Sequence, residues 1–165
     1  MSTSPALPRR RSRRFDSLEQ EAFLNLWRTY DRLRALEDAL FTSHDLTAQQ
    51  YNALRLLRGV SPGTLPTLTL AERLVSRAPD ITRLLDKLAQ RGLIERQRPP
   101  DNRRTVRIGI TPAGLALLER LDEPVRDCHA RQLGHLKPAE LKQLIQTLHA
   151  AREPHEPDGS SWANQ

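Results

Sequence analysis

The sequence has a single cysteine, Cys128, and only 4% of its residues are aromatic. One cysteine excludes an intramolecular disulfide, which is typical of a protein of the reducing cytoplasm. Because aromatic rings are scarce, the core is expected to consist mainly of leucine. The apolar runs are all shorter than the roughly 18 residues that a membrane-spanning helix needs. No association with a membrane is therefore expected.

Acidic residues are missing from residues 1–14, which contain five arginines. Residues 73–107 add ten Lys or Arg against four Asp or Glu, a net charge of +6. The whole chain also has a net charge of +6, so the residues outside these two segments carry a net charge of −5. Positive charge is concentrated in two places, which favours a polyanionic partner; a solvated basic face is the alternative.

A chain of 165 residues is long enough for one domain with its own core. Apolar residues at three- and four-residue spacing indicate a mainly α-helical protein. Helices are predicted over residues 18–41, 47–58 and 79–91, over a segment that includes LAERLV, and from residues 112 and 138 onward. A basic arm at residues 1–14 and a flexible tail at 152–165 are expected to be disordered, and the body is expected to span residues 15–151.

Several helix ends are marked by residues with a specific local role. Thr47 and Gln50 have the spacing of a capping box. Thr111 is predicted to be an N-cap that precedes a proline at the first helical position. Gly92 is predicted to end a helix in the left-handed conformation. Pro124 is expected to kink or interrupt the fifth helix.

Two short helices, which contain LAERLV and PDITRLLDKLAQR, follow the breaker-rich SPGTLP and are predicted to form a helix-turn-helix. Pro79 suits the first turn of the second of them. Residues 93–98 and 106–110 then have strand character, so PPDNRR is predicted to be the loop of a β-hairpin. The fold class expected is mainly α with a small β-hairpin wing, a winged helix-turn-helix.

The helix at 79–91 carries an apolar stripe on one side. The stripe consists of Ile81, Leu84, Leu85 and Leu88. On the opposite side, Arg83 or Lys87 can donate to guanine O6 and N7, and Thr82 can contact a phosphate or a thymine methyl group. Asp80 can accept from cytosine N4 or stabilise the helix start. A solvated face, on which acidic residues relieve the repulsion between the cations, is the alternative.

The predicted hairpin loop is rich in arginine. A tip that carries Arg103 and Arg104 beside a recognition helix can reach the neighbouring minor groove, where narrow A·T stretches concentrate negative potential. A plain exposed loop is the alternative, because an arginine at a turn costs little to solvate.

The order of these elements resembles the MarR family of bacterial winged helix-turn-helix transcription regulators over about residues 20–150. The stretches that carry the resemblance are LTAQQYNALRLL, LAERL, ITRLLDKLAQRGLIER and DNRRTVRIGITPAG. The resemblance implies a winged helix-turn-helix at about 46–111, flanked by N- and C-terminal dimerisation helices at about 17–42 and 112–151. It also implies a homodimer and, in many members, a small ligand between the dimerisation and DNA-binding parts.

The chain departs from the family pattern in two places. The family's wing has Asp-Arg-Arg or Asp-x-Arg, whereas Asn102 takes the Asp position here, directly after Asp101. The wing arginines carry over as Arg103 and Arg104. Many members have Ser-Arg-Ser before the Thr-Arg pair, whereas this chain has RAPD, which begins with Arg77. Arg77 joins the expected DNA contacts, and base preference does not transfer from the family.

Other candidate sites have weaker support. Cys128 and His129 are adjacent, so on a helix they point about 100° apart and make a poor nucleophile and base. The histidines show no metal-ligand spacing and no glycine-rich phosphate loop occurs, so no catalytic residue, metal or cofactor is expected. Trp27, Tyr30 and His44 are candidates for lining an effector pocket; core and dimer packing is the alternative.

The sequence therefore predicts a cytoplasmic, non-enzymatic homodimer that binds double-stranded DNA. We expect a ligand-responsive repressor on a pseudo-palindromic operator, with half-sites about 10 base pairs apart. Two alternatives stay open. One is an architectural DNA-binding protein that tolerates any sequence, and the other is an enzyme or protein-interaction module in which the basic hairpin is incidental.

Overall fold

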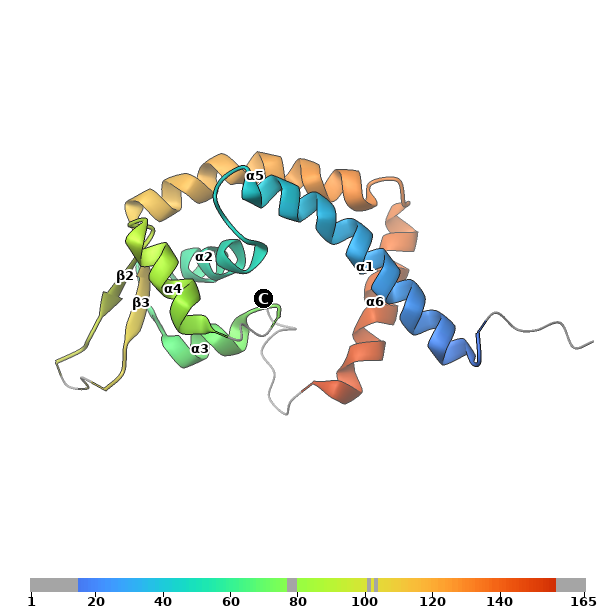
Figure 1. Cartoon of the computed structure of the whole chain (residues 1–165), viewed down its shortest axis with the longest axis horizontal. Coiled ribbons are helices and arrows are strands. Elements are labelled where there is room, and N and C mark those ends of the chain that lie inside the picture. Colours follow the sequence, from blue (N-terminus) through green and yellow to red (C-terminus); the bar gives the residue numbers. More distant parts are fainter. Residues whose placement is uncertain (1–14, 77–79, 101, 103, 157–165) are drawn as a thin grey trace, which may run out of the picture. The chain divides into compact units, whose positions relative to one another are not determined.

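The computed structural model describes residues 15–76, 80–100, 102 and 104–156. This part of the chain is mainly helical with a small antiparallel sheet, which confirms the expected fold class (Figure 1). The elements are α1 (Leu18–Thr42), α2 (Ala48–Val60), β1 (Leu65–Pro66), α3 (Thr67–Arg73), α4 (Ile81–Gln90), β2 (Ile94–Gln97), β3 (Arg107–Ile110), α5 (Pro112–Leu133), α6 (Pro138–Arg152) and the 3-10 turn η1 (Glu153–His155).

The chain divides into two compact units, residues 1–35 and 36–165. The second unit contains the hydrophobic core, to which α2, α3, α4, β3 and α5 all contribute. Its most deeply buried side chains are Leu54, Leu57, Leu70, Leu85, Leu88, Ile108, Leu118 and Leu121. All but one of these are leucines, as expected for a chain with so few aromatic residues. Figure 1 shows α2, α3 and α4 gathered beside the hairpin.

Three of the predicted helix-end signals are confirmed. The Thr47 hydroxyl accepts a hydrogen bond from the Gln50 amide (3.2 Å), and the Gln50 side chain accepts one from the Thr47 amide (2.9 Å). Gly92 has a φ of 67°, a conformation that costs glycine little. Thr111 caps α5.

The prediction that Pro79 lies in the first turn of α4 is wrong, because α4 begins at Ile81 with Asp80 as its N-cap. Pro79 itself lies outside the described residues.

The sheet has three strands in the order β1-β3-β2. The predicted hairpin is confirmed, because Ile94 pairs with Ile110 and Gln97 pairs with Arg107 in antiparallel register. The strand β1, which pairs with the other side of β3, was not expected from the breaker-rich SPGTLP. Its two residues are too few to show alternation, and a proline is tolerated in an edge strand.

The expectation that Pro124 interrupts the fifth helix is wrong, since α5 is one continuous helix. A proline removes one intrahelical hydrogen bond. Leu121, Val125 and Cys128 are buried around it and hold the helix together through packing. At the start of α5, a side chain on Gly114 would collide with the Leu93 carbonyl oxygen and with a neighbouring isoleucine. This helix therefore starts in close contact with the root of the hairpin.

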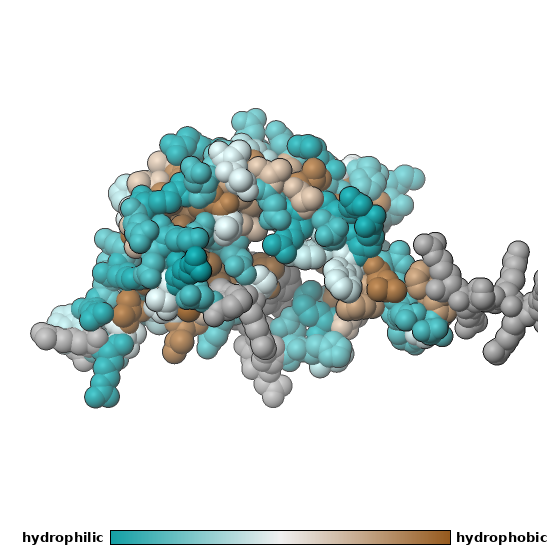
Figure 2. Space-filling view, in the orientation of Figure 1, coloured by the Kyte–Doolittle hydropathy of each residue, from teal (hydrophilic) through white to brown (hydrophobic). Residues whose placement is uncertain are grey.

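Two helices leave many of their apolar residues exposed or only half-buried. The helix α1 buries only Phe41, and α6 buries none of its residues. The exposed apolar residues of the first unit are Leu18, Phe23, Leu24, Leu26, Trp27 and Tyr30. Figure 2 shows apolar surface in the region of the view that α1 crosses. None of the helices in the described ranges has the length and hydropathy that crossing a bilayer requires.

Candidate nucleic-acid interface

The helix α4 is strongly amphipathic, as its sequence predicts. Leu84, Leu85 and Leu88 are buried, whereas Thr82 and Arg83 are exposed. Lys87, one turn further along, is also exposed. Since residues three and four apart share a helix face, the exposed side presents polar and cationic groups to a partner.

The side chain of Asp80 forms the N-cap of α4. Its Oδ1 accepts a hydrogen bond from the Arg83 amide at 2.8 Å. A carboxylate at this end also interacts favourably with the helix dipole. Of the two roles considered for Asp80, the structure therefore contains the stabilisation of the helix start.

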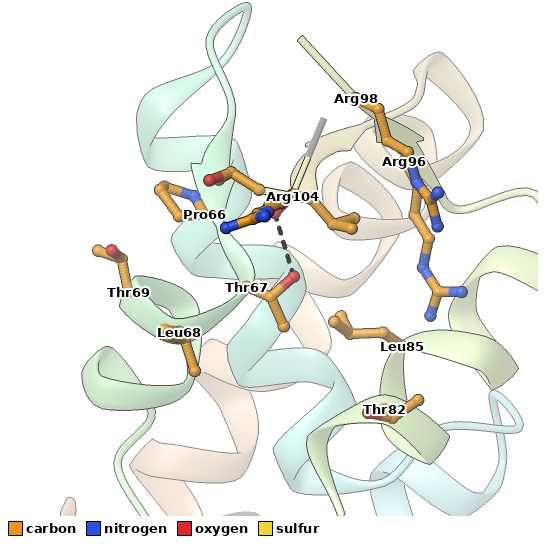
Figure 3. Close-up of a pocket in the computed structure, with 11 residues that line it drawn as sticks. Pro66, Thr67, Leu68, Thr69, Thr82, Leu85, Arg96, Arg98 and Arg104 are labelled. Carbon is orange, nitrogen blue, oxygen red and sulfur yellow. Dashed lines mark hydrogen bonds between the residues drawn. The ribbon is translucent and has the colours of Figure 1, made fainter. Parts of the chain in front are cut away.

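A slot of ≈ 930 Å³ lies where the hairpin faces α3 and α4 (Figure 3). We call it the wing slot. It is lined by Pro66, Thr67, Leu68, Thr69, Thr82, Leu85, Arg96, Arg98, Arg104, Thr105 and Val106. In Figure 3, Arg96 and Arg98 lie at one side of the view and the α3 residues at the other.

The described lining of the wing slot is cationic, because it includes three arginines and no acidic residue. Threonine hydroxyls complete its polar surface. The hydroxyl of Thr67 is already used, since it donates to the Val106 carbonyl at 3.2 Å. The other polar groups of the slot suit a phosphate oxygen, which accepts strong hydrogen bonds from guanidinium groups.

Two arginines of the hairpin bind within the chain. Arg107 is half-buried, and its guanidinium donates to the hydroxyl and carbonyl oxygens of Thr64 at 2.7 and 2.6 Å. Arg96 donates to Asp86 of α4 at 2.6 Å. The hydrogen bonds of Arg107 connect β3 to the segment before β1. The bond of Arg96 connects β2 to α4. The arginines of this stretch therefore have different roles.

The structure brings some of the expected DNA contacts together. Thr82 and Arg104 line the same wing slot, although they are distant in sequence. Arg77 and Arg103 lie outside the described residues.

The candidate set did not include Arg96, Arg98 or Thr69, which also line the slot. The spacing of Arg96 and Arg98 could have indicated that both line one surface, because residues two apart in an extended chain share a face.

The candidates for an effector pocket are placed differently. Trp27 and Tyr30 are 62% and 57% exposed on α1 in the first unit. In the second unit, the Nδ1 atom of His44 lies 3.1 Å from the Leu40 carbonyl oxygen and 3.0 Å from the Ser43 hydroxyl. His44 thus binds the end of α1, the helix from which it follows.

A second pocket, of ≈ 690 Å³, lies between α2, α3 and α6. It is lined by Asn52, Arg55, Leu56, Gly59, Val60, Arg73, Val75, Ile145, Leu148, His149 and Arg152. Its described lining therefore combines three arginines and a histidine with aliphatic side chains. The Val75 amide donates to the Asn52 side chain at 2.9 Å, so the pocket wall extends into the segment that leads to α4.

Comparison with known proteins gives consistent matches. Residues 46–106 match the profile described as the MarR family. The chain is 33% identical over 107 residues to the HTH-type transcriptional regulator FarR of Neisseria gonorrhoeae, which covers 63% of this chain and 72% of FarR. A MarR transcription factor from Planctomyces limnophilus is 58% identical, with a TM-score of 0.66 over 83% of this chain and 99% of that one.

A more distant structure has a similar fold. It is that of BpsR from Bordetella bronchiseptica, whose DNA binding is regulated by 6-hydroxynicotinic acid. BpsR is 24% identical, with a TM-score of 0.71 over 79% of this chain and 98% of that one.

Proposed function

Because this chain belongs to the MarR family of transcription regulators, we propose that it is a ligand-responsive repressor that binds a pseudo-palindromic operator as a homodimer. The observation that carries the proposal is the wing slot beside the exposed face of α4. This arrangement places cationic and hydroxyl groups on two neighbouring elements. The proposal places the protein in the cytoplasm, where bacterial DNA lies.

In the proposed complex, α4 enters the major groove and the hairpin reaches the adjacent minor groove. Arg83 and Lys87 then read base edges. The phosphodiester strand that separates the two grooves enters the wing slot, where Thr82 and Arg98 contact it, and Arg104 reaches past it into the minor groove. Arg77 and Arg103 remain predicted contacts, and Asp80 acts by holding the first turn of α4.

The experiment that tests this function is a binding titration on operators recovered as bound genomic fragments. Arg83→Ala should cost about 1 to 3 kcal/mol per half-site and relax the preference at one operator position. Arg103→Ala and Arg104→Ala should cost more when the flanks are A·T-rich than when they are G·C-rich. Arg126→Ala, on the exposed side of α5, is the control. It should change neither the operator affinity nor the preference for particular bases or flanks.

The outcome also separates the regulator from its alternatives. A regulator should prefer its operator over competitor DNA by roughly 10³ or more. Equal losses for every variant on every sequence would leave an architectural DNA-binding protein. Absence of DNA binding at moderate salt would leave the third class, in which the basic hairpin is incidental.

The exposed and half-buried apolar residues of α1 and α6 support the proposed homodimer. A second copy of the chain can cover such surfaces, as apolar area rarely stays in water at this extent. Two-fold symmetry then sets the half-sites about 10 base pairs apart, so that both α4 helices lie on one side of the DNA.

For the effector, the pocket between α2, α3 and α6 suits an amphipathic anion. Arg55 and Arg73 can pair with a carboxylate while the aliphatic side chains pack on its apolar part. The regulation of BpsR by an aromatic acid supports this chemistry. Occupancy would press on Val75, and so shift the segment before α4.

Calorimetric titration with a panel of aromatic and aliphatic carboxylates tests the effector site. Arg55→Ala should weaken binding, and the bound acid should lower operator affinity. Trp27, Tyr30 and His44 are the competing prediction. Quenching of Trp27 fluorescence by the acid, together with unchanged binding in Arg55→Ala, would place the effector there instead.

A further inference from the structure

Asp86 is an acidic residue on the side of α4 that the proposed function turns toward DNA. It follows Thr82 by four positions and Arg83 by three, so the three side chains share one helix face. A carboxylate here repels the phosphates of any duplex, whatever its sequence. An acidic side chain in this place therefore calls for a physical reason.

The carboxylate of Asp86 is paired with Arg96, one of the three arginines of the wing slot. An Arg96 terminal nitrogen lies 2.6 Å from Asp86 Oδ1, and the two side chains are 38% and 45% exposed. The two residues carry no net charge as a unit. The charge of Arg96 is therefore compensated within the chain, and a phosphate would have to compete with the Asp86 carboxylate for its guanidinium.

Arg98 is the natural comparison for Arg96. It lies two residues further along and lines the same slot. Within the ranges that the structure describes, no hydrogen bond or ion pair engages its guanidinium. Within those ranges the charge of Arg98 is uncompensated and can bind a phosphate, whereas the charge of Arg96 is paired with Asp86.

We propose that Asp86 withholds Arg96 from the DNA backbone and thereby limits the sequence-independent part of the affinity. This inference rests on the proposed DNA-binding function. Phosphate contacts by Lys and Arg supply most of the affinity for non-specific DNA, and they raise it for every sequence. Neutralising one of them inside the chain lowers the affinity for competitor DNA while the base contacts stay intact. Asp86 is therefore a specificity-determining residue that acts through Arg96.

The test measures how the affinity for a random-sequence duplex depends on salt. Each phosphate contact contributes about 0.9 to the slope of log affinity against log salt. Arg98→Ala should reduce the slope by about that amount. Arg96→Ala alone would leave the Asp86 carboxylate unpaired beside the DNA, so the contribution of Arg96 is measured in a double variant. Asp86→Ala should release Arg96 and steepen the slope by about 0.9, so that between about 50 and 200 mM salt the affinity falls roughly threefold more than that of the unmodified protein. The double variant Asp86→Ala/Arg96→Ala should return the slope to that of the unmodified protein.

Either of two slope measurements would overturn the proposal. A slope that falls as much in Asp86→Ala/Arg96→Ala as in Arg98→Ala means that Arg96 already binds a phosphate in the unmodified protein. A slope unchanged in Asp86→Ala means that Arg96 is not held back. Asp86→Asn, which keeps the side-chain volume, gives the same test should the alanine variant unfold. If the unmodified protein binds no DNA, the proposed function fails instead, and that result is distinct from either slope.

Discussion

The core of the second unit and the helix α6 use the same kind of apolar periodicity with opposite results. In the core, Leu54 and Leu57 of α2 are completely buried. In α6, the stripe formed by Leu141, Leu144, Ile145 and Leu148 contains no buried residue. The difference teaches that a regular apolar stripe predicts a helix but not which surface covers it. In α6, we propose, the cover comes from a second copy of the chain.

Removal of residues 138–165, which include α6, should have the largest effect, because it should change the oligomeric state. Without α6, a proposed part of the dimer interface is lost, and the chain should form monomers or aggregates. Light scattering measures this, and circular dichroism checks that the remaining helices stay folded. A truncated protein that remains a well-behaved dimer contradicts the role of α6.

A substitution inside the core tests the other side of the comparison. Leu57→Ala should lower the free energy of unfolding by about 2 to 5 kcal/mol, since it leaves a cavity among buried side chains. The matched control is Leu68→Ala, because Leu68 is 74% exposed. That control should stay within about 0.5 kcal/mol of the unmodified protein in urea titrations. Similar losses in both would mean that the core is not the source of stability.

The capping box tests how much one local interaction at the start of α2 contributes to the free energy of unfolding. Thr47→Ala removes the hydroxyl that accepts from the Gln50 amide and should cost about 1 kcal/mol in thermal or urea unfolding. Thr42→Ala, at the exposed end of α1, is the control and should cost less. The cap is unimportant if the two variants unfold together.

The smallest expected effect concerns the thiol of Cys128, which burial protects. Desolvation raises the pKa of Cys128, with a further contribution from the Glu37 carboxylate. The folded state thus favours the neutral thiol, so its contribution to stability is full below the pKa of the unfolded thiol and is lost as the pH rises through the folded pKa. Iodoacetamide at pH 8 should label native protein much more slowly than denatured protein. Equal rates would show that the thiol is accessible.

The sequence predicts best what depends on neighbouring residues. The Thr47 capping box, the left-handed Gly92 and the buried stripe of α4 are all encoded within a few positions, and all three are confirmed. The continuity of α5 through Pro124 could not be predicted in this way, because it depends on buried contacts with other elements.

The candidate site was predictable only in part, for the same reason. The exposed polar face of α4 follows from its periodicity. The pairing of Arg107 with Thr64 joins residues 43 positions apart, and that of Arg96 with Asp86 depends on how the hairpin packs on α4. No local pattern separates these arginines from Arg98 or Arg104. Their different roles emerge only when the strands are paired.

The root of the hairpin is braced, because β3 is bonded to β2 on one side and to β1 on the other. In the described part of the hairpin, this ladder ends at the pair of Gln97 and Arg107. Val106, the first residue beyond that pair, still packs against the core and accepts a hydrogen bond from the Thr67 amide. Further along the loop, residues can be gained, lost or exchanged in evolution without this constraint. A lineage can therefore change which operators its protein reaches by altering the loop alone, while the scaffold is inherited intact.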